Sequence, residues 1–151
     1  MGMNRIFKFI AIILTSYFLQ YCIENKPLQI GSFYQGGIVL NYDDSAHCGL
    51  IISASDLNSN LTWLEGKILC DTTTLSGFDD WRMPTTEELI LCYKVLHLNK
   101  KTQFQLKTPY WASHEGKLGY FAWYVDFSNG NAYESNENNV AQIRAIREFR
   151  L

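Results

Sequence analysis

The sequence predicts an α+β fold, in which strands come first, two helices follow and an antiparallel sheet closes the domain. Three observations support this prediction. Short apolar runs with turn residues between them occupy residues 36–52, apolar residues recur every three or four positions over residues 57–96, and apolar and polar residues alternate after residue 108. With 151 residues, of which 47% are hydrophobic, the chain is long enough for one domain with a sizeable core.

The first 22 residues have the pattern of a secretory signal peptide. Arg5 and Lys8 precede an apolar stretch of about a dozen residues, which is too short to span a bilayer. We therefore expect export, and an extracytoplasmic location for the mature protein.

Residues 19–22, Leu-Gln-Tyr-Cys, are similar to the lipobox of bacterial lipoproteins, in which the cysteine becomes the lipidated first residue. Tyr21 departs from that pattern, because the residue before the cysteine is usually small. We expect lipidation of Cys22, which would make the membrane a partner of the protein; plain cleavage and an uncleaved anchor are the alternatives. Residues 23–34 would then form a short polar tether and residues 35–151 the domain.

The mature chain is expected to be acidic. Loss of the first 22 residues removes two basic side chains and no acidic one, which leaves eleven basic and fifteen acidic side chains and a net charge of about −4. A protein that binds nucleic acid would be expected to have a strongly basic face, so the composition argues against that class. It remains compatible with a local basic patch.

Three cysteines remain in the domain, and the sequence alone does not decide among their three pairings. A bridge between Cys70 and Cys92 is preferred for an exported protein, because these two residues flank the segment Asp80-Trp-Arg-Met-Pro84. The alternative is that all three, with Cys48, are buried thiols that act as small hydrophobic residues. None has the spacing of a metal site, so no metal and no cofactor is expected.

The first elements predicted along the domain are a β-hairpin and a helix. Residues 36–40, Gly-Gly-Ile-Val-Leu, and residues 49–52, Gly-Leu-Ile-Ile, are short apolar runs separated by a polar turn, which indicates the hairpin. Residues 57–71 carry leucine and isoleucine at spacings near three and four, and Thr62 can cap a helix, so we expect the first helix there.

A second helix is predicted to start at Thr85 and to run to about Leu96. Pro84 cannot lie inside a helix, whereas Thr85 followed three residues later by Glu88 is a capping box. The residues before Thr85 then form a loop that leads into the helix.

That loop, Asp80-Trp-Arg-Met-Pro84, has a structural explanation. We expect Trp81 to fill the core and Asp80 and Arg82 to hydrogen-bond backbone groups. The carboxylates near the helix start are explained by the positive end of the helix dipole, and no catalytic role is assigned to them.

The last part of the chain is predicted to form an antiparallel sheet, because apolar and polar residues alternate there with a period of two. Asn129-Gly130 is a strong signal for a hairpin turn. The expected strands are residues 108–113, 120–127, 131–133 and 143–149, with a polar loop at residues 134–139.

Four motifs and an opening hairpin resemble the Lcl C-terminal domain family in their order and approximate spacing. The segments are GGIVL at 36–40, GLIISASD at 49–56, DWRMPTTEEL at 80–89, YWAS at 110–113, AWYVDFSNG at 122–130 and IRAIREF at 143–149. The resemblance covers residues 35–149, which is nearly the whole mature chain. It implies a C-type-lectin-like fold, with two helices packed on an antiparallel sheet and long polar loops.

The resemblance also implies a function and a role for one motif. The family implies surface adhesion through a lectin-like domain, to a glycan such as a sulfated polysaccharide or to host matrix. This chain departs from that pattern, because it lacks a collagen-like repeat and its mature charge is negative. The residues that would form the fold signature are Asp80, Trp81, Arg82 and Pro84.

A stretch without acidic residues is the first candidate binding site. Lys94, Lys100, Lys101 and Lys107 lie in it and would form a polyanion-binding patch. The alternative is a solvated helix end followed by a loop, where lysines also complement the helix dipole.

Aromatic residues and a polar loop supply two further candidates. Tyr124 and Tyr133 are the tyrosines expected to be exposed enough to stack on a sugar. The loop at residues 134–139 is rich in oxygen atoms of the kind that bind Ca²⁺. The Ca²⁺ motifs of true C-type lectins are missing, so a plain polar loop without metal is expected.

We do not expect an enzyme. Formylglycine-generating enzymes are similar in their lectin-like scaffold but use a reactive cysteine pair late in the fold, and every cysteine here precedes Tyr93. The sequence contains no Ser-His-Asp order, phosphate-binding loop or His-Glu-x-x-His motif. The alternative to an adhesin is a structural or protein-interaction lipoprotein of the envelope without a sugar ligand.

Overall fold

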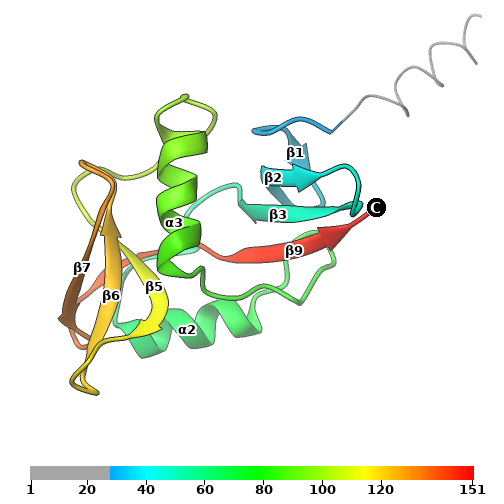
Figure 1. The fold of residues 1–151 in the computed structure, drawn as a ribbon. Helices are drawn as coiled ribbons and strands as arrows, with labels where there is room; N and C mark the ends of the chain where they lie inside the picture. The colour runs from blue at the N-terminus through cyan, green and yellow to red at the C-terminus, as the bar shows by residue number, and fades with distance from the viewer. Residues whose placement is uncertain (1–27) are drawn as a thin grey trace, which may run out of the picture.

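The structure is a computed structural model that describes residues 28–151 (Figure 1). The expected signal peptide, Cys22 and residues 23–27 of the expected tether lie outside the described residues. Residues 28–34 of that tether are described and belong to the fold, because Leu28 packs on the core and Phe33–Tyr34 form a strand, so the tether was predicted too long. Within residues 28–151, no helix combines the length and the apolar character needed to cross a membrane. The α+β class predicted from the sequence is confirmed, with two short helices and two sheets.

The first sheet joins the two ends of the domain. The predicted hairpin is present as β2 and β3, and the C-terminal strand β9 pairs antiparallel with β3. The strand order is β1-β2-β3-β9. The strands are β1 (Phe33–Tyr34), β2 (Gly37–Asp43), β3 (Cys48–Ser53) and β9 (Ile146–Arg150).

The second sheet contains five strands in the order β4-β8-β5-β6-β7. Its pairs are antiparallel except for β5 and β8, which run parallel, so the prediction of a purely antiparallel sheet was wrong at that pair. The strands are β4 (Asn58–Leu61), β5 (Tyr110–Glu115), β6 (Phe121–Asp126), β7 (Asn131–Asn136) and β8 (Ala141–Ile143).

Two sequence predictions in this region need correction. The segment 143–149, predicted as one strand, is divided between β8 and β9, because the chain leaves the second sheet after Ile143 and joins the first at Ile146. The expected polar loop at 134–139 is in part the strand β7, which continues to Asn136 opposite Phe121.

The helices begin at the capping boxes that the sequence contains. Helix α2 (Trp63–Thr72) starts after Thr62, so residues 57–61 belong to β4 or precede it and the predicted helix began too early. Helix α3 (Thr86–Cys92) starts after Thr85, as predicted, and continues as the π-helical segment η1 (Tyr93–His97). The last turns therefore reach the predicted end near residue 96.

Helix α3 lies between the two sheets (Figure 1). Its buried residues Leu89 and Cys92 share one core cluster with Ile52 of the first sheet and with Val125 and Phe127 on one face of the second. The opposite face of the second sheet packs in another cluster, which contains Trp63 of α2, Trp81 and Trp111. The two helices thus fill opposite sides of the second sheet.

Close approach of α2 to the second sheet depends on a glycine. A Cβ atom on Gly66 would overlap the side chain of Ile143 in β8. Trp63 Nε1 donates to the carbonyl of Ala112 at 2.7 Å, and Trp111 Nε1 donates to the carbonyl of Leu61 at 3.0 Å. These indole bonds fix the helix and β4 against β5.

Candidate functional site

Asp80 and Arg82, in the loop before α3, each form an ion pair. Asp80 forms a two-pronged pair with Arg147 of β9, whose Nη2 lies 3.0 Å from Asp80 Oδ2. The main partner of the Asp80 carboxylate is therefore a side chain that the sequence analysis did not identify, while a backbone hydrogen bond of the predicted kind contributes less to its lowered pKa. The hydrogen bonds from Arg147 lower the pKa of Asp80, and the guanidinium carbon lies 4.0 Å from the centre of the Phe78 ring.

Arg82 is bound to the helix that follows it. Its Nη1 and Nη2 donate to the two carboxylate oxygens of Glu88 at 2.8 and 2.7 Å, and Glu88 also accepts from Thr85 N at 2.7 Å. Burial alone would raise the pKa of Glu88, but the bonds from Arg82 and Thr85 outweigh it and the pKa is lowered. The predicted bonds to backbone groups are made by the backbone of Arg82 and not by its side chain. Its N–H and its carbonyl pair with the carbonyl and the N–H of Ile146.

The remaining signature residues are structural, as predicted. Trp81 is 2% exposed and belongs to a core cluster. The carbonyl of Pro84 accepts from Ser113 N of β5 at 2.8 Å. The signature therefore seats α3 between β9 and β5.

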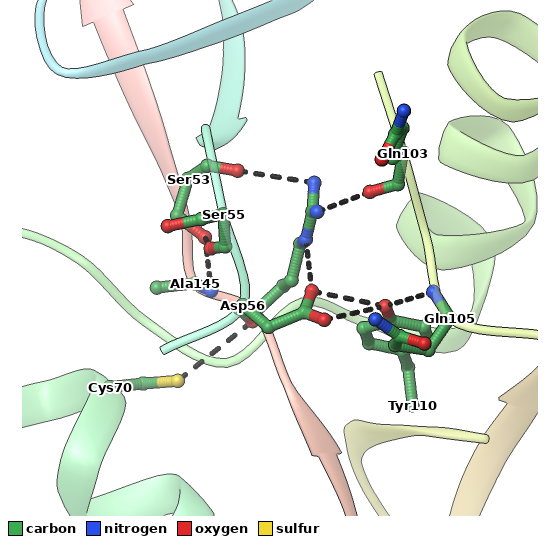
Figure 2. A network of polar contacts seen from close by, with 9 residues as sticks. Ser53, Ser55, Asp56, Cys70, Gln103, Gln105, Tyr110 and Ala145 are labelled. Carbon is green, nitrogen blue, oxygen red and sulfur yellow. Dashed lines mark hydrogen bonds and ion pairs between the residues drawn. The ribbon is translucent and has the colours of Figure 1, made fainter. Parts of the chain in front are cut away.

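The sequence analysis missed a buried polar network centred on Arg144. Figure 2 shows its partners Ser53, Asp56 and Gln103. This residue connects β8 to β9 and its side chain is only 3% exposed. Its Nε lies 2.6 Å from Asp56 Oδ1, and its terminal nitrogens donate to the carbonyls of Gln103 and Ser53. The guanidinium carbon also lies 4.1 Å from the centre of the Phe104 ring.

Tyr110 completes this network. Its hydroxyl donates to the Asp56 carboxylate at 3.0 Å and accepts from Gln105 N at 2.8 Å (Figure 2). Burial raises the pKa of Tyr110 far above its usual value, so the phenol stays protonated. Because Tyr110 and Arg144 are buried, the network joins chain segments that are far apart in the sequence. A hint was available in the sequence, since an arginine within an apolar strand pattern requires a buried partner.

The cysteines do not form the predicted bridge. Cys48, Cys70 and Cys92 are free thiols, and the two residues of the preferred pair lie in different core clusters. Burial raises the pKa of Cys70 to about 12 and that of Cys92 further, as expected for the alternative of inert buried thiols. Across residues 28–151, no group of three or more His, Cys, Asp or Glu residues could hold a metal ion.

The two tyrosines proposed for sugar stacking form a cross-strand pair. Tyr124 of β6 lies directly opposite Tyr133 of β7, with ring centres 5.7 Å apart and ring planes inclined by 36°. On the side of Tyr124 away from Tyr133, Trp111 of β5 lies opposite it. The rings of Trp111 and Tyr124 meet edge to face, with their centres 6.1 Å apart. Tyr133 is 41% exposed and Tyr124 is half-buried, so the pair forms an aromatic surface with a buried indole next to it.

Polar groups surround this pair near the β6–β7 turn. The side-chain amides of Asn129 and Asn131 lie 3.4 and 3.5 Å from the hydroxyl oxygen of Tyr133. Asp126 holds the turn by accepting from Ser128 N at 2.8 Å. Burial, and then the negative charge of Asp126, raise the pKa of Tyr124. The surface thus combines two aromatic rings with amide and carboxylate groups, which is a chemistry suited to hydroxyl-rich ligands.

The four lysines of the other candidate patch are exposed and lie elsewhere. They belong to η1 and the loop after it, and this helical unit packs on the face of the second sheet that carries Val125. Tyr124 alternates with Val125 along β6 and belongs to the opposite face. The tyrosine pair and the lysines therefore cannot form one site.

A groove of about 430 Å³ lies beside β3 and β9, away from both candidate surfaces. Glu88, Glu148 and Arg150 contribute to its lining. Glu88 is already bound to Arg82, so the groove does not present a free pair of carboxylates for acid–base chemistry.

The comparison with known families agrees with the motifs. The family model described as Lcl C-terminal domain matches residues 43–147. This range includes both helices and all strands except β1, all but the last residue of β2 and the last three residues of β9. No curated protein matches the chain.

Proposed function

Because the chain belongs to the Lcl C-terminal domain family, we propose that it is an exported envelope protein that binds a glycan through Tyr124 and Tyr133. In this proposal the domain is lectin-like, a lipid on Cys22 anchors it to the membrane, and the protein acts as an adhesin at the cell surface. The domain acts by binding and does not transform its ligand.

The tyrosine pair is the observation that carries the proposal. Sugar rings have apolar faces of C–H groups that pack on aromatic rings, and their hydroxyls need hydrogen-bonding partners nearby. The pair offers adjacent rings on one sheet face, with Asn129 and Asn131 beside them. Trp111 limits the movement of Tyr124, which reduces the entropy lost when a ligand binds.

A non-catalytic role is supported by what the acidic residues do. Asp56, Asp80 and Glu88 each bind an arginine, and those bonds join segments of the core. Carboxylates held in this way are poorly placed to give or take a proton from a substrate.

A glycan array tests the proposal with the chain that starts at residue 23. We expect binding to at least one glycan class, and Tyr133→Ala to weaken it by more than about fivefold, as expected for an aromatic anchor. Tyr120→Ala is a matched control, because Tyr120 is also exposed, at 54%, but lies outside the pair. Equal losses in both variants would contradict the assignment of the site.

The array also separates the two candidate functions. A blank array, with the protein still open to protease on intact cells, would favour the alternative of a structural or protein-interaction lipoprotein without a sugar ligand. The anchor is tested separately by mass spectrometry of the mature N-terminus, where we expect an acylated peptide that begins at Cys22. An unmodified N-terminus would contradict that part of the proposal.

A further inference from the structure

Two chain segments form a basic surface without acidic residues. Residues 28–36 contain no charged residue, and residues 94–107 contain four lysines, one histidine and no acid. Their combined formal charge is about +4 with the histidine neutral, on a mature chain whose net charge is negative.

The two segments adjoin in the fold. A Cβ atom on Gly31 would lie 2.6 Å from Lys101 Cδ, so the aliphatic stem of that lysine rests on the backbone just before β1. Figure 1 shows the segment leading into β1 and the loop after α3 at the same end of the molecule. We call the surface formed by residues 28–36 and 94–107 the lysine–leucine face.

Large apolar side chains are exposed in the same two segments. Leu98 and Leu106, in the loop after η1, are 58% and 53% exposed, and Phe33 of β1 is 65% exposed. Ile30, next to Gly31, is 43% exposed. Apolar side chains interspersed with lysines are typical of surfaces that lie in the interface of a bilayer.

We propose that the lysine–leucine face docks on a membrane surface that contains anionic lipids. The lysines would interact with the headgroups, while Leu98, Leu106 and Phe33 would enter the boundary with the acyl chains. Each lysine near such a surface contributes about 1 kcal/mol, which corresponds to about fivefold in binding.

The position of the face relative to the proposed anchor supports this partner. Five residues lie between Cys22 and Leu28, and the six steps from one Cα atom to the next reach at most about 22 Å in a fully extended chain. A lipid on Cys22 would therefore keep the face, which begins at residue 28, close to the bilayer. A polybasic surface beside a lipid chain is a second signal that makes anchoring firm. This step rests on the proposed anchor, whereas the charge and the exposed leucines do not.

A sulfated polysaccharide is the competing partner for the same lysines. It would use the positive charge but has no need of exposed leucines. The apolar side chains therefore favour the bilayer, and the two partners can be separated experimentally.

Vesicle cosedimentation tests the proposal with the chain that starts at residue 23 and so lacks any lipid. Both core clusters lie between residues 28 and 149, so this chain keeps the whole described fold. Vesicles of phosphatidylcholine with one quarter phosphatidylglycerol are compared with phosphatidylcholine alone. The variants are Lys100→Glu with Lys107→Glu, and Leu98→Ser with Leu106→Ser.

A matched control lies on the β5–β6 turn, where Lys117 and Leu118 are exposed side by side. We expect binding to the anionic vesicles, a loss of about 25-fold or more in the double lysine variant and a clear loss in the double leucine variant. The variant Lys117→Glu with Leu118→Ser should bind like the unmodified chain.

Three outcomes would overturn the proposal. In the first, the unmodified chain binds both vesicle types equally. In the second, the control variant loses as much vesicle binding as the lysine and leucine variants. In the third, the unmodified chain binds no vesicles but binds heparin beads, and the lysine variant abolishes the binding to heparin. Because the glycan array and the Tyr133 variant address another face, their failure would leave this result unchanged.

Discussion

Replacement of Asp56 by alanine should be strongly destabilising. Arg144 is only 3% exposed, and without Asp56 its guanidinium would keep only backbone carbonyls as acceptors. Removal of one partner of a buried ion pair costs about 3–5 kcal/mol. The hydroxyl of Tyr110 also loses its acceptor, at about 1 kcal/mol. The total of about 4–6 kcal/mol is a large part of the roughly 5–15 kcal/mol that stabilises a typical domain.

Urea unfolding followed by tryptophan fluorescence measures this effect, since Trp63, Trp81 and Trp111 are buried. With a slope of about 2 kcal/mol per M urea, the midpoint should fall by about 2–3 M. Asp79→Ala is the control, because Asp79 is exposed, and its effect should stay within about 0.5 kcal/mol. Asp80→Ala should lie between the two, because Arg147 is only 7% exposed but the side chain of Asp80 is 54% exposed, so that water weakens this pair more than the pair of Asp56.

A double-mutant cycle decides whether the ion pair itself is responsible. Asp56→Ala combined with Arg144→Met removes both charges, so the double variant should be more stable than the sum of the single effects predicts, by about 0.5–3 kcal/mol. Additive effects, or an Asp56→Ala variant as stable as the Asp79→Ala control, would refute this explanation of the network.

Two further predictions concern acid and thiol chemistry. The pKa of Glu88 is lowered in the folded protein, so its contribution to stability is present above the unfolded carboxyl pKa of about 4.3 and is lost as the pH falls through the folded pKa. Glu88→Gln removes the charged partner of Arg82 and should lower the free energy of unfolding at pH 7, as measured by urea unfolding. It should also flatten the decline of that free energy below pH 4.3. An unchanged dependence of the free energy on pH below 4.3 would contradict this. In the chain that starts at residue 23 and so lacks Cys22, a thiol reagent should modify Cys48 rapidly, because it is half-buried, and should reach the buried Cys70 and Cys92 only on unfolding. Loss of the fast phase in Cys48→Ser checks the assignment, and a fast phase that persists would refute it.

Local features of the fold were predictable because their causes are local. A threonine followed three residues later by glutamate fixes both helix starts, at Thr62 and Thr85, and the structure has both capping boxes. The first helix was nevertheless predicted from residue 57, since apolar spacing extends upstream of the cap. The cap, and not the apolar pattern, decides where that helix begins.

Long-range features were not predictable for a different reason. Asp56 and Arg144 are 88 residues apart, and nothing near either residue identifies its partner. Alternation over residues 143–149 indicates extended chain but does not show that the chain changes sheets at Arg144. The pairing of Tyr124 with Tyr133 could have been predicted, because the turn at Asn129-Gly130 places the strands on either side of it opposite each other.

The ion pairs explain what the shared motifs specify. The first pair joins Asp56, from GLIISASD, to Arg144 of IRAIREF, and the second joins Asp80, from DWRMPTTEEL, to the next arginine of IRAIREF. The first pair fixes the segment after β3 to the connection between the two sheets, and the second fixes the loop before α3 to β9. Within AWYVDFSNG, Tyr124 is a partly exposed ring, and its partner Tyr133 lies outside every motif. The lysines of the lysine–leucine face also lie outside the motifs. The motifs therefore contribute the ion pairs that hold the scaffold, whereas the two proposed binding surfaces contribute nothing to those pairs, and fold and function are specified by different residues of this chain.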